Sequence, residues 1–232
     1  MHERAYGLDD VSVVMGAYNE VDAIGPVLDD IEAATDGRAE AVVVDSSDDG
    51  TAAVARDHGA TVVDQPPRGY GVAVSRALRE ATTPVRVTTD CDGTYPMDRI
   101  PDFLDLVNEG YDVVSGDRLY HGARTMPRVN RAGNHAFAAL ASLLSGRRLH
   151  DVTTGMRAYH ESVVESIEWT ENTGLSAELL IRPVMRGYRV REEPIDYDER
   201  IGETKLDPFA GGRAIGGSIL TVCAEERRRR RS

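Results

Sequence analysis

The sequence contains few cysteines, a single lysine and no long hydrophobic run, and each shortage excludes a class of protein. Its 232 residues include Cys91 and Cys223, which form no C-x-x-C pair, so we expect neither a disulfide framework nor a zinc site, and a reducing compartment. No apolar run approaches the ~18 residues that a membrane-spanning helix needs. Residues 1–4 carry no apolar stretch, so we expect no secretory signal there.

The charge balance is strongly acidic and argues against general binding to nucleic acid. The formal net charge is -12, and a phosphate backbone repels such a surface. Lys205 is the only lysine among 27 lysines and arginines. Many acids with almost no lysine resemble proteins from a high-salt cytoplasm, although GC-rich coding explains arginine over lysine equally well.

The first half of the chain alternates short apolar runs with segments of helical periodicity. For example, Ile24, Leu28 and Ile31 recur at helical spacing. We expect strands over 11–15, 41–45, 61–64, 85–90 and 111–115, separated by helices over 22–35, 51–58, 71–81 and 97–108. This alternation predicts an α/β protein with a mainly parallel, Rossmann-like sheet flanked by helices.

The second half is less regular but shows no linker, so a single domain is expected. We expect helices over 130–144 and 175–186, strands over 152–159 and 188–195, a polar loop over 200–209 and a short final helix over 216–224. We divide the domain into a nucleotide-sugar-binding half, 1–117, and an acceptor-binding half, 118–232, which ends in a basic tail.

Acidic clusters follow three of the expected strands, where a parallel sheet places its ligand. Asp90 and Asp92 stand two apart in extended chain and therefore point the same way. Paired carboxylates suit Mg2+ or Mn2+, and such a cation suits a diphosphate. The pattern predicts a nucleotide-sugar site; the alternative is that these are solvated loop acids.

The other strand ends each allow two interpretations. Asp45 could accept hydrogen bonds from a base or ribose, or it could cap the helix over 51–58. Glu20 could contact the nucleotide or begin the helix at 22. Gly69 and Gly71 do not complete a G-x-G-x-x-G pattern, so we expect no NAD site and assign the pair to close backbone approach to the nucleotide.

Basic residues are rare enough here that their clustering after residue 117 requires an explanation. Arg118, Arg124, Arg128 and Arg131 lie close together, and guanidinium groups bind phosphate bidentately. Further on, Arg200 and Lys205 share a polar loop that could close over a diphosphate and neutralise the leaving group. The alternatives are ordinary surface arginines and an ordinary surface loop.

Six motifs in order resemble the family 2 inverting glycosyltransferases of the GT-A fold, in particular the dolichyl-phosphate hexose synthases. They are Ala17-Tyr18-Asn19-Glu20, Val44-Asp45 with Asp49-Gly50-Thr51, Asp90-Cys91-Asp92, Ser115-Gly116-Asp117-Arg118, the segment 151–157 and the segment 200–206. The chain departs from the family pattern at Ser46, at Gly93-Thr94-Tyr95 and at Arg128-Val129-Asn130-Arg131.

The resemblance implies transfer of a hexose from UDP or GDP to a polyprenyl (dolichyl) phosphate by metal-assisted inversion, feeding protein N-glycosylation or cell-surface glycan assembly. It assigns catalysis to Asp92, Arg118 and Arg200, and Mg2+ or Mn2+ to Asp90 and Asp92. It assigns the donor to Ala17, Tyr18, Glu20, Asp45, Asp90 and Lys205. It assigns the acceptor phosphate to Arg118, Arg128, Arg131 and Asn134.

The expected partner is a lipid phosphate, with no nucleic acid. We expect a cytoplasmic protein in peripheral contact with the inner face of the cell membrane, through the tail 227–231 or a membrane-anchored partner; a solvated tail is the alternative. A phosphate acceptor is already anionic and needs no base. A soluble transferase acting on a small phosphorylated or sugar acceptor is a second hypothesis, and a sugar hydroxyl would need a carboxylate base such as Asp117 or Glu178. The third is an inactive nucleotide-sugar-binding subunit.

Overall fold

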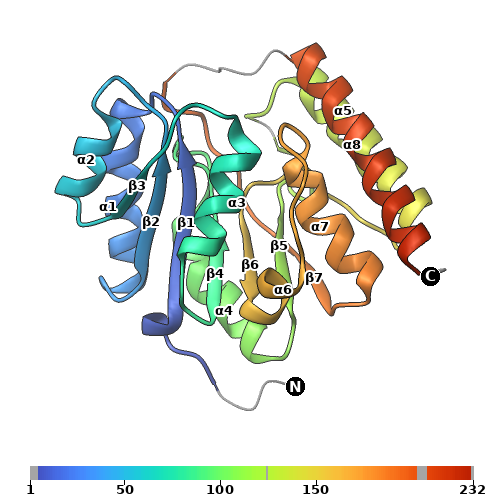
Figure 1. The fold of residues 1–232 in the computed structure, drawn as a ribbon, viewed down its shortest axis with the longest axis horizontal. Helices are drawn as coiled ribbons and strands as arrows, with labels where there is room; N and C mark the ends of the chain where they lie inside the picture. Colours follow the sequence, from blue (N-terminus) through green and yellow to red (C-terminus); the bar gives the residue numbers. More distant parts are fainter. Residues whose placement is uncertain (1–4, 124, 203–207, 231–232) are drawn as a thin grey trace.

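Seven strands form one sheet through the middle of the protein (Figure 1). The computed structural model describes residues 5–123, 125–202 and 208–230. The strands are β1 (Val11–Ala17), β2 (Glu40–Asp45), β3 (Thr61–Asp64), β4 (Val85–Thr88), β5 (Val113–Asp117), β6 (Arg157–His160) and β7 (Val190–Pro194). Their order is β3-β2-β1-β4-β6-β5-β7, and β6 alone runs antiparallel to its neighbours. The expected mainly parallel sheet is confirmed.

Helices cover both faces of this sheet (Figure 1). They are α1 (Val21–Thr35), α2 (Thr51–Asp57), α3 (Tyr70–Glu80), α4 (Ile100–Asn108), α5 (Arg128–Ser145), α6 (Glu161–Ser166), α7 (Leu175–Arg186) and α8 (Pro208–Arg229), with 3-10 turns η1 (Leu8–Asp10) and η2 (Met97–Arg99). Helices α1, α2 and α4 pack on one face, and α3, α6 and α7 pack on the other. The two halves of the chain share the sheet and form one domain.

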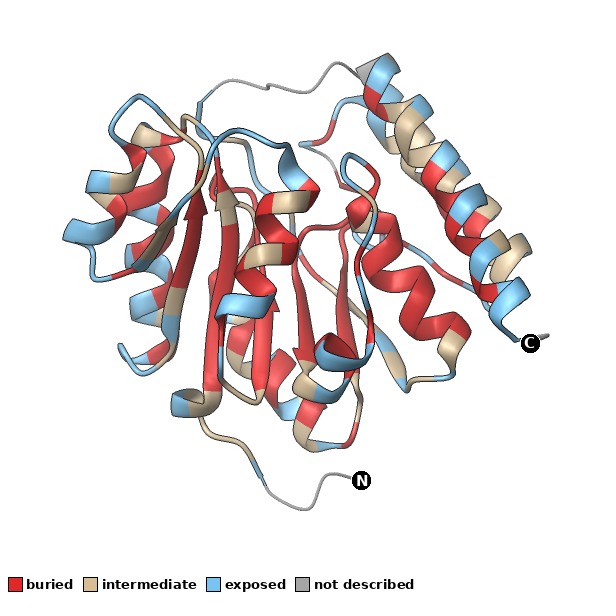
Figure 2. Ribbon diagram, in the orientation of Figure 1, coloured by how far each residue is buried: buried red, intermediate tan, exposed pale blue. Residues whose placement is uncertain are grey.

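Alternation along the strands divides the core into two layers. In β1, Val13 and Met15 join the cluster beneath α1 and α4, whereas Val14 joins the cluster beneath α3 and α7. Val113 and Val114 of β5 divide in the same way. This follows from the period of two along a strand, and it explains why the central strands are apolar on both faces. Figure 2 shows the resulting buried centre.

A third layer consists of α5 and α8, which pack against α7 through Ile181, Ile219 and Val222. Ion pairs reinforce this contact. The Arg182 guanidinium lies 2.6 Å from the Glu178 carboxylate and 2.9 Å from that of Glu226, and all three side chains are buried. Arg186 also pairs with Glu226, at 2.7 Å. Helix α8 is therefore attached by apolar packing and by a buried charge network.

Two elements in the second half differ from expectation. The strand expected over 152–159 is β6, which begins only at Arg157. Backbone groups of the preceding Val152 and Gly155 bond to side chains instead of a neighbouring strand. The Val152 carbonyl accepts from Arg157 Nη2 at 3.1 Å, and Gly155 N–H donates to the Tyr95 hydroxyl at 2.6 Å. The final helix is long, Pro208–Arg229, rather than short. Its four glycines lower helix propensity, but packing on α5 and α7 overrides that preference.

We expect Arg182→Ala to lower the free energy of unfolding by about 3–5 kcal/mol, because it leaves the fully buried Glu178 carboxylate without its counter-charge and removes one of the two arginines paired with the buried Glu226. Denaturant titration followed by circular dichroism measures this change. Arg76→Ala is the matched control, since Arg76 forms an exposed i,i+4 pair with Glu80. The control should cost less than about 0.5 kcal/mol. Equal losses in the two variants would show that the network contributes no more than a surface pair.

Candidate active site

The acidic clusters meet at the carboxyl ends of β2, β1 and β4, which are neighbours in the sheet. Ala17 ends β1 and is buried, whereas the following Tyr18 is half exposed. Glu20, Asp45 and Asp92 are all buried although they are acids. The sheet therefore gathers side chains that stand far apart in sequence, as predicted.

Hydrogen bonds hold the loops after β1 and β2 together. Asn19 N–H donates to the Ser47 hydroxyl at 2.7 Å, and that hydroxyl donates to Asp45 Oδ1 at 2.6 Å. Glu20 N–H donates to the Thr51 hydroxyl at 2.9 Å. These bonds orient the Asp45 and Glu20 carboxylates at one edge of the sheet.

The capping alternative for Asp45 is wrong, because another acid takes that role. Asp49 Oδ1 accepts hydrogen bonds from the Thr51 amide at 3.0 Å and from its hydroxyl at 2.6 Å, at the start of α2. Asp45 instead accepts from the Ser47 amide and hydroxyl. Glu20 does precede α1, but its backbone carbonyl rather than its carboxylate accepts from the first turn of that helix.

Asp90 and Asp92 leave the end of β4 with different surroundings. Asp92 Oδ1 accepts from the Thr94 amide and hydroxyl, at 3.1 and 2.7 Å. Asp90 Oδ1 accepts from the Tyr70 hydroxyl at 3.0 Å. Burial, with the neighbouring charge of Asp92, raises the pKa of Asp90 to about 6. A cation bound between the two carboxylates would relieve this repulsion.

Gly155 allows the backbone to lie against the Asp90 carboxylate. A Cβ atom at this position would be 2.7 Å from Asp90 Oδ2, so any larger residue would displace the acid. The close approach of Asp90 therefore explains why a glycine stands in the segment 151–157, which the sequence alone did not explain.

Arg200 provides a cation on the other side of Asp92. Its Nη1 lies 2.6 Å from Asp92 Oδ2, and its Nη2 pairs with Glu20 Oε1. The structure therefore brings three of the assigned residues together across the ends of β1 and β4. Lys205, assigned to the same loop, lies outside the described residues, as does Arg124.

The residues at the end of β4 fit a divalent metal ion. Asp90 and Asp92 supply hard oxygen atoms, their mutual repulsion favours a counter-charge, and Gly155 keeps the space beside Asp90 free of a side chain. Among the described residues, no group of three or more His, Cys, Asp or Glu is arranged to hold a metal. Within the described part of the chain, we therefore assign the metal no protein ligand beyond Asp90 and Asp92.

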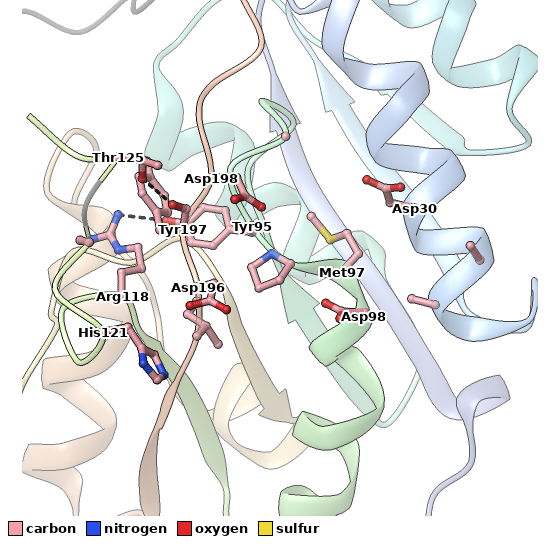
Figure 3. A pocket seen from close by; sticks show the side chains of 16 residues that line it. Asp30, Tyr95, Met97, Asp98, Arg118, His121, Thr125, Asp196, Tyr197 and Asp198 are labelled. Carbon is pink, nitrogen blue, oxygen red and sulfur yellow. Dashed lines mark hydrogen bonds between the residues drawn. The ribbon is translucent and has the colours of Figure 1, made fainter.

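Arg118 is buried and is held mainly by Asp151. Its Nε and Nη2 atoms lie 2.7 and 2.9 Å from the two Asp151 oxygens, and Nη2 also donates to Thr153 at 2.8 Å. Its Nη1 donates to the Tyr95 hydroxyl at 3.2 Å (Figure 3), and its guanidinium stacks on Tyr197 at 5.1 Å. Burial alone would lower the pKa of Arg118 and raise that of Asp151, but the ion pair reverses both shifts.

This geometry changes the expectation for Arg118. A guanidinium has five N–H donors, and four of them are directed at Asp151, Thr153 and Tyr95. Its bidentate fork faces a carboxylate of the protein, so Arg118 can offer a phosphate one N–H at most. We interpret it as a residue that organises the loops around the site. Sequence reasoning missed Asp151 and Tyr95 as its partners.

The remaining acceptor residues lie at the start of α5. Arg128 is exposed. Arg131 Nη1 donates to the Gly122 carbonyl at 2.8 Å, and Asn134 donates to the sulfur of Met126 at 3.3 Å. Arg128 is therefore the member of this group whose guanidinium is most accessible to a phosphate.

The glycines before α3 approach the protein rather than a nucleotide. A Cβ on Gly71 would lie 2.5 Å from the carbonyl oxygens of Glu171 and Asn172, and a Cβ on Gly69 would meet the Asn172 side chain. Gly71 N–H donates to Asn172 Oδ1 at 2.9 Å. The expected role of this pair in nucleotide approach is replaced by packing of α3 against the loop before α7.

A cavity of about 910 Å³ lies beside Arg118 and opens between η2 and the segment after β7 (Figure 3). Tyr95 and Arg118 form its inner end, whereas Asp30, Asp98, Asp196 and Asp198 line it elsewhere. Because these carboxylates repel an anion, the cavity does not suit a phosphate except beside Arg118.

The two carboxylates considered as a base for a sugar hydroxyl are both occupied. Glu178 is fully buried and accepts hydrogen bonds from Arg182 and from the amides of Thr170 and Glu171. Asp117 accepts from two amides in the turn after β5, and burial together with the charge of Asp151 raises its pKa. Glu178 belongs to the network that attaches α8, not to the site.

We expect Tyr95→Phe to lower the free energy of unfolding by about 2 kcal/mol or more, because the amide of Gly155 and one N–H of Arg118 lose a buried acceptor. Denaturant titration measures the change. Tyr159→Phe is the control, since the buried Tyr159 hydroxyl donates to the Leu179 carbonyl over a long distance, 3.3 Å. Its loss should be about 1 kcal/mol. A Tyr95→Phe loss no larger than the control would contradict the bonding described here.

Comparison with known proteins agrees with the site. Residues 12–168, more than half of the chain, match glycosyl transferase family 2. The chain is similar to a solved glucosyl-3-phosphoglycerate synthase from Mycobacterium tuberculosis, in complex with Mn2+, UDP-glucose and phosphoglyceric acid. The identity is 26%, the TM-score is 0.73, and the match covers 92% of this chain and 79% of the other.

Curated relatives are closer in sequence. A Haloferax volcanii protein named dolichyl-phosphate hexose transferase is 66% identical over 224 residues, covering 97% of this chain and 98% of the relative. Glycosyltransferase AglJ from the same organism is 34% identical over 215 residues, covering 89% of this chain and 70% of the relative. The family match, the fold and the carboxylates at the strand ends agree, and the chain belongs to glycosyl transferase family 2.

Proposed function

We propose that this glycosyltransferase moves a hexose from a UDP- or GDP-sugar to a polyprenyl phosphate of the dolichyl type. The observation that carries the proposal is the 66% identity to a protein named dolichyl-phosphate hexose transferase, which extends over 97% of this chain and so includes every described site residue. The oxygen-rich edge of the sheet supports a nucleotide-sugar donor. A role in glycan assembly follows from this proposal and rests on it.

The donor would lie across the ends of β2, β1 and β4. Asp45 and Glu20 would accept hydrogen bonds from the base or ribose, and Ala17 and Tyr18 would line the site. Asp90 and Asp92 would hold Mg2+ or Mn2+, which supplies positive charge for a departing diphosphate. A solved relative contains Mn2+ and UDP-glucose, which supports this class of donor and cation.

The acceptor phosphate would bind near the start of α5. Arg128 is exposed there, and Arg131 and Asn134 lie within two turns of it on the same helix. A phosphate monoester is already largely anionic near pH 7, so its oxygen can attack the anomeric carbon without a general base. This agrees with a site whose nearby carboxylates, Asp117 among them, are already occupied. The protein's task is to position two substrates and balance their charge.

A lipid acceptor requires contact with a membrane, and the outer side of α5 and α8 is suited to it. Val129 and Leu143 of α5 are 70% and 78% exposed, and Leu220 of α8 is 54% exposed. Exposed alanines at 132, 136 and 139 join Val129 and Leu143 in a single stripe along α5. Among the described residues, no helix is both long enough and apolar enough to cross a membrane.

Charge supports the same surface. Helix α5 contains no acid, although the whole chain carries a net charge of -12. Arg227 of α8 donates to the Leu144 carbonyl at 2.6 Å, so the basic end of α8 lies beside the exposed Arg147 and Arg148 that follow α5. Each arginine near an anionic leaflet contributes about 1 kcal/mol, less at high salt. We infer direct peripheral contact through this surface, without requiring an anchored partner.

The proposed reaction is tested with the purified protein, Mn2+ and labelled UDP- and GDP-hexoses in high salt. We expect label to enter the organic phase with dolichyl phosphate as acceptor. Asp92→Asn should abolish this transfer without loss of fold, because it removes a carboxylate charge at the proposed metal site. Asp98→Asn is the control. Asp98 lies in η2, shortly after the aspartate pair, but it is exposed, so this variant should retain activity.

An aqueous product with 3-phosphoglycerate, and none with dolichyl phosphate, would favour the soluble transferase instead. Absence of transfer with every donor and acceptor, with donor binding shown by calorimetry, would favour the inactive subunit.

The proposed membrane surface is tested by cosedimentation with vesicles containing phosphatidylglycerol. We expect Ala136→Asp and Leu143→Asp to reduce vesicle binding several-fold, because they place a carboxylate in the apolar stripe of α5. Ala53→Asp adds the same charge to an exposed alanine of α2 and should leave binding unchanged. Equal binding by all variants would exclude α5 as the contact.

A further inference from the structure

The Arg200 guanidinium occupies the position of a bridging cation between two carboxylates. It pairs with Asp92 Oδ2 from the loop after β4, at 2.6 Å, and with Glu20 Oε1 from the loop after β1. The Asp92 and Glu20 side chains are only 7% and 10% exposed, and that of Arg200 is 27% exposed. Three charges that sit this far from solvent interact more strongly than an ordinary surface pair.

The backbone holds this arginine in place. Ile201 N–H donates to the Asp92 carbonyl at 2.8 Å, and Asp198 N–H donates to the Thr94 carbonyl at 3.0 Å. The segment from Asp198 to Ile201 therefore runs along the turn that carries the aspartate pair. The side chain of Arg200 reaches Asp92 as a consequence of this pairing, not through the conformation of a free loop.

The hydrogen bonds of Asp92 show which of its two carboxylate oxygens could bind a metal ion. Oδ1 already accepts from the Thr94 amide and hydroxyl, which uses both of its lone pairs. Oδ2 is therefore the oxygen that remains for a metal ion, and Arg200 donates to it. A cation bound there would be strongly repelled by the guanidinium beside it.

We propose that Arg200 is a built-in counter-cation that competes with the divalent metal for Asp92, so that metal binds firmly only when a diphosphate draws the arginine away. The proposal rests on the metal assignment made above. Phosphate oxygens offer the guanidinium an equivalent or better partner, since Arg–phosphate pairs are charge-assisted and bidentate. Donor and metal then bind together, and the released arginine neutralises the leaving group.

The test measures binding of Mn2+ alone by isothermal titration calorimetry, without nucleotide and at constant ionic strength. We expect Arg200→Gln to lower the Mn2+ dissociation constant about tenfold, which equals about 1.4 kcal/mol. Arg99→Gln is the matched control: Arg99 has similar exposure, 33%, and pairs with Asp102 and Glu193 away from the site. It should leave Mn2+ binding unchanged. Asp90→Asn should abolish binding.

The outcomes separate this inference from the proposal beneath it. If Asp90→Asn abolishes Mn2+ binding but Arg200→Gln leaves it unchanged or weakens it, the metal site is correct and the competition is wrong. If Asp90→Asn binds Mn2+ as well as the unchanged protein, the metal assignment fails and the competition fails with it. If Arg99→Gln tightens binding as much as Arg200→Gln, the gain is a general charge effect and the inference is overturned.

Discussion

The buried ion pair between Arg118 and Asp151 connects the parts of the site that the sheet alone does not join. Both groups are removed from water, which is unfavourable for each charge separately and tolerable only because they face each other with full hydrogen bonding. Arg118 follows β5, Asp151 precedes β6, and Tyr95 links both to the turn after β4. Loss of this pair would release all three loops. The positions of Asp90 and Asp92 therefore depend on an ion pair to which neither of them belongs.

Arginine also balances the charge of other buried acids in this chain. Glu20 and Asp92 are bridged by Arg200 in the site, and Glu178 and Glu226 are bridged by Arg182 beneath α8. Asp90 receives a hydrogen bond from Tyr70 but no ion pair among the described residues, and its pKa is raised. Of the two carboxylates at the proposed metal site, Asp92 is therefore paired with an arginine, whereas Asp90 has no such partner among the described residues.

The acids and the apolar surface lie on different parts of the molecule. Carboxylates surround the cavity beside Tyr95, whereas α5 has exposed apolar residues and no acid. Helix α5 begins with Arg128, so the proposed acceptor site lies at the end of the proposed membrane surface. A lipid phosphate held there would have its chain directed along α5, which connects the two proposals through one helix.

The sequence by itself determined the fold class, the strands at or after whose ends Asp45, Asp90 and Asp92 lie, and the family, because these depend on local periodicity and on residues within single segments. It did not determine that Arg118 is held by Asp151, that Arg200 pairs with Asp92, or that α8 begins at Pro208. Only the tertiary structure decided these, because each depends on a partner distant in sequence. Asp151 stands 33 residues from Arg118, and Arg200 stands 108 from Asp92. The partners of such side chains depend on which loops the sheet brings together, and the pattern within one segment does not show this.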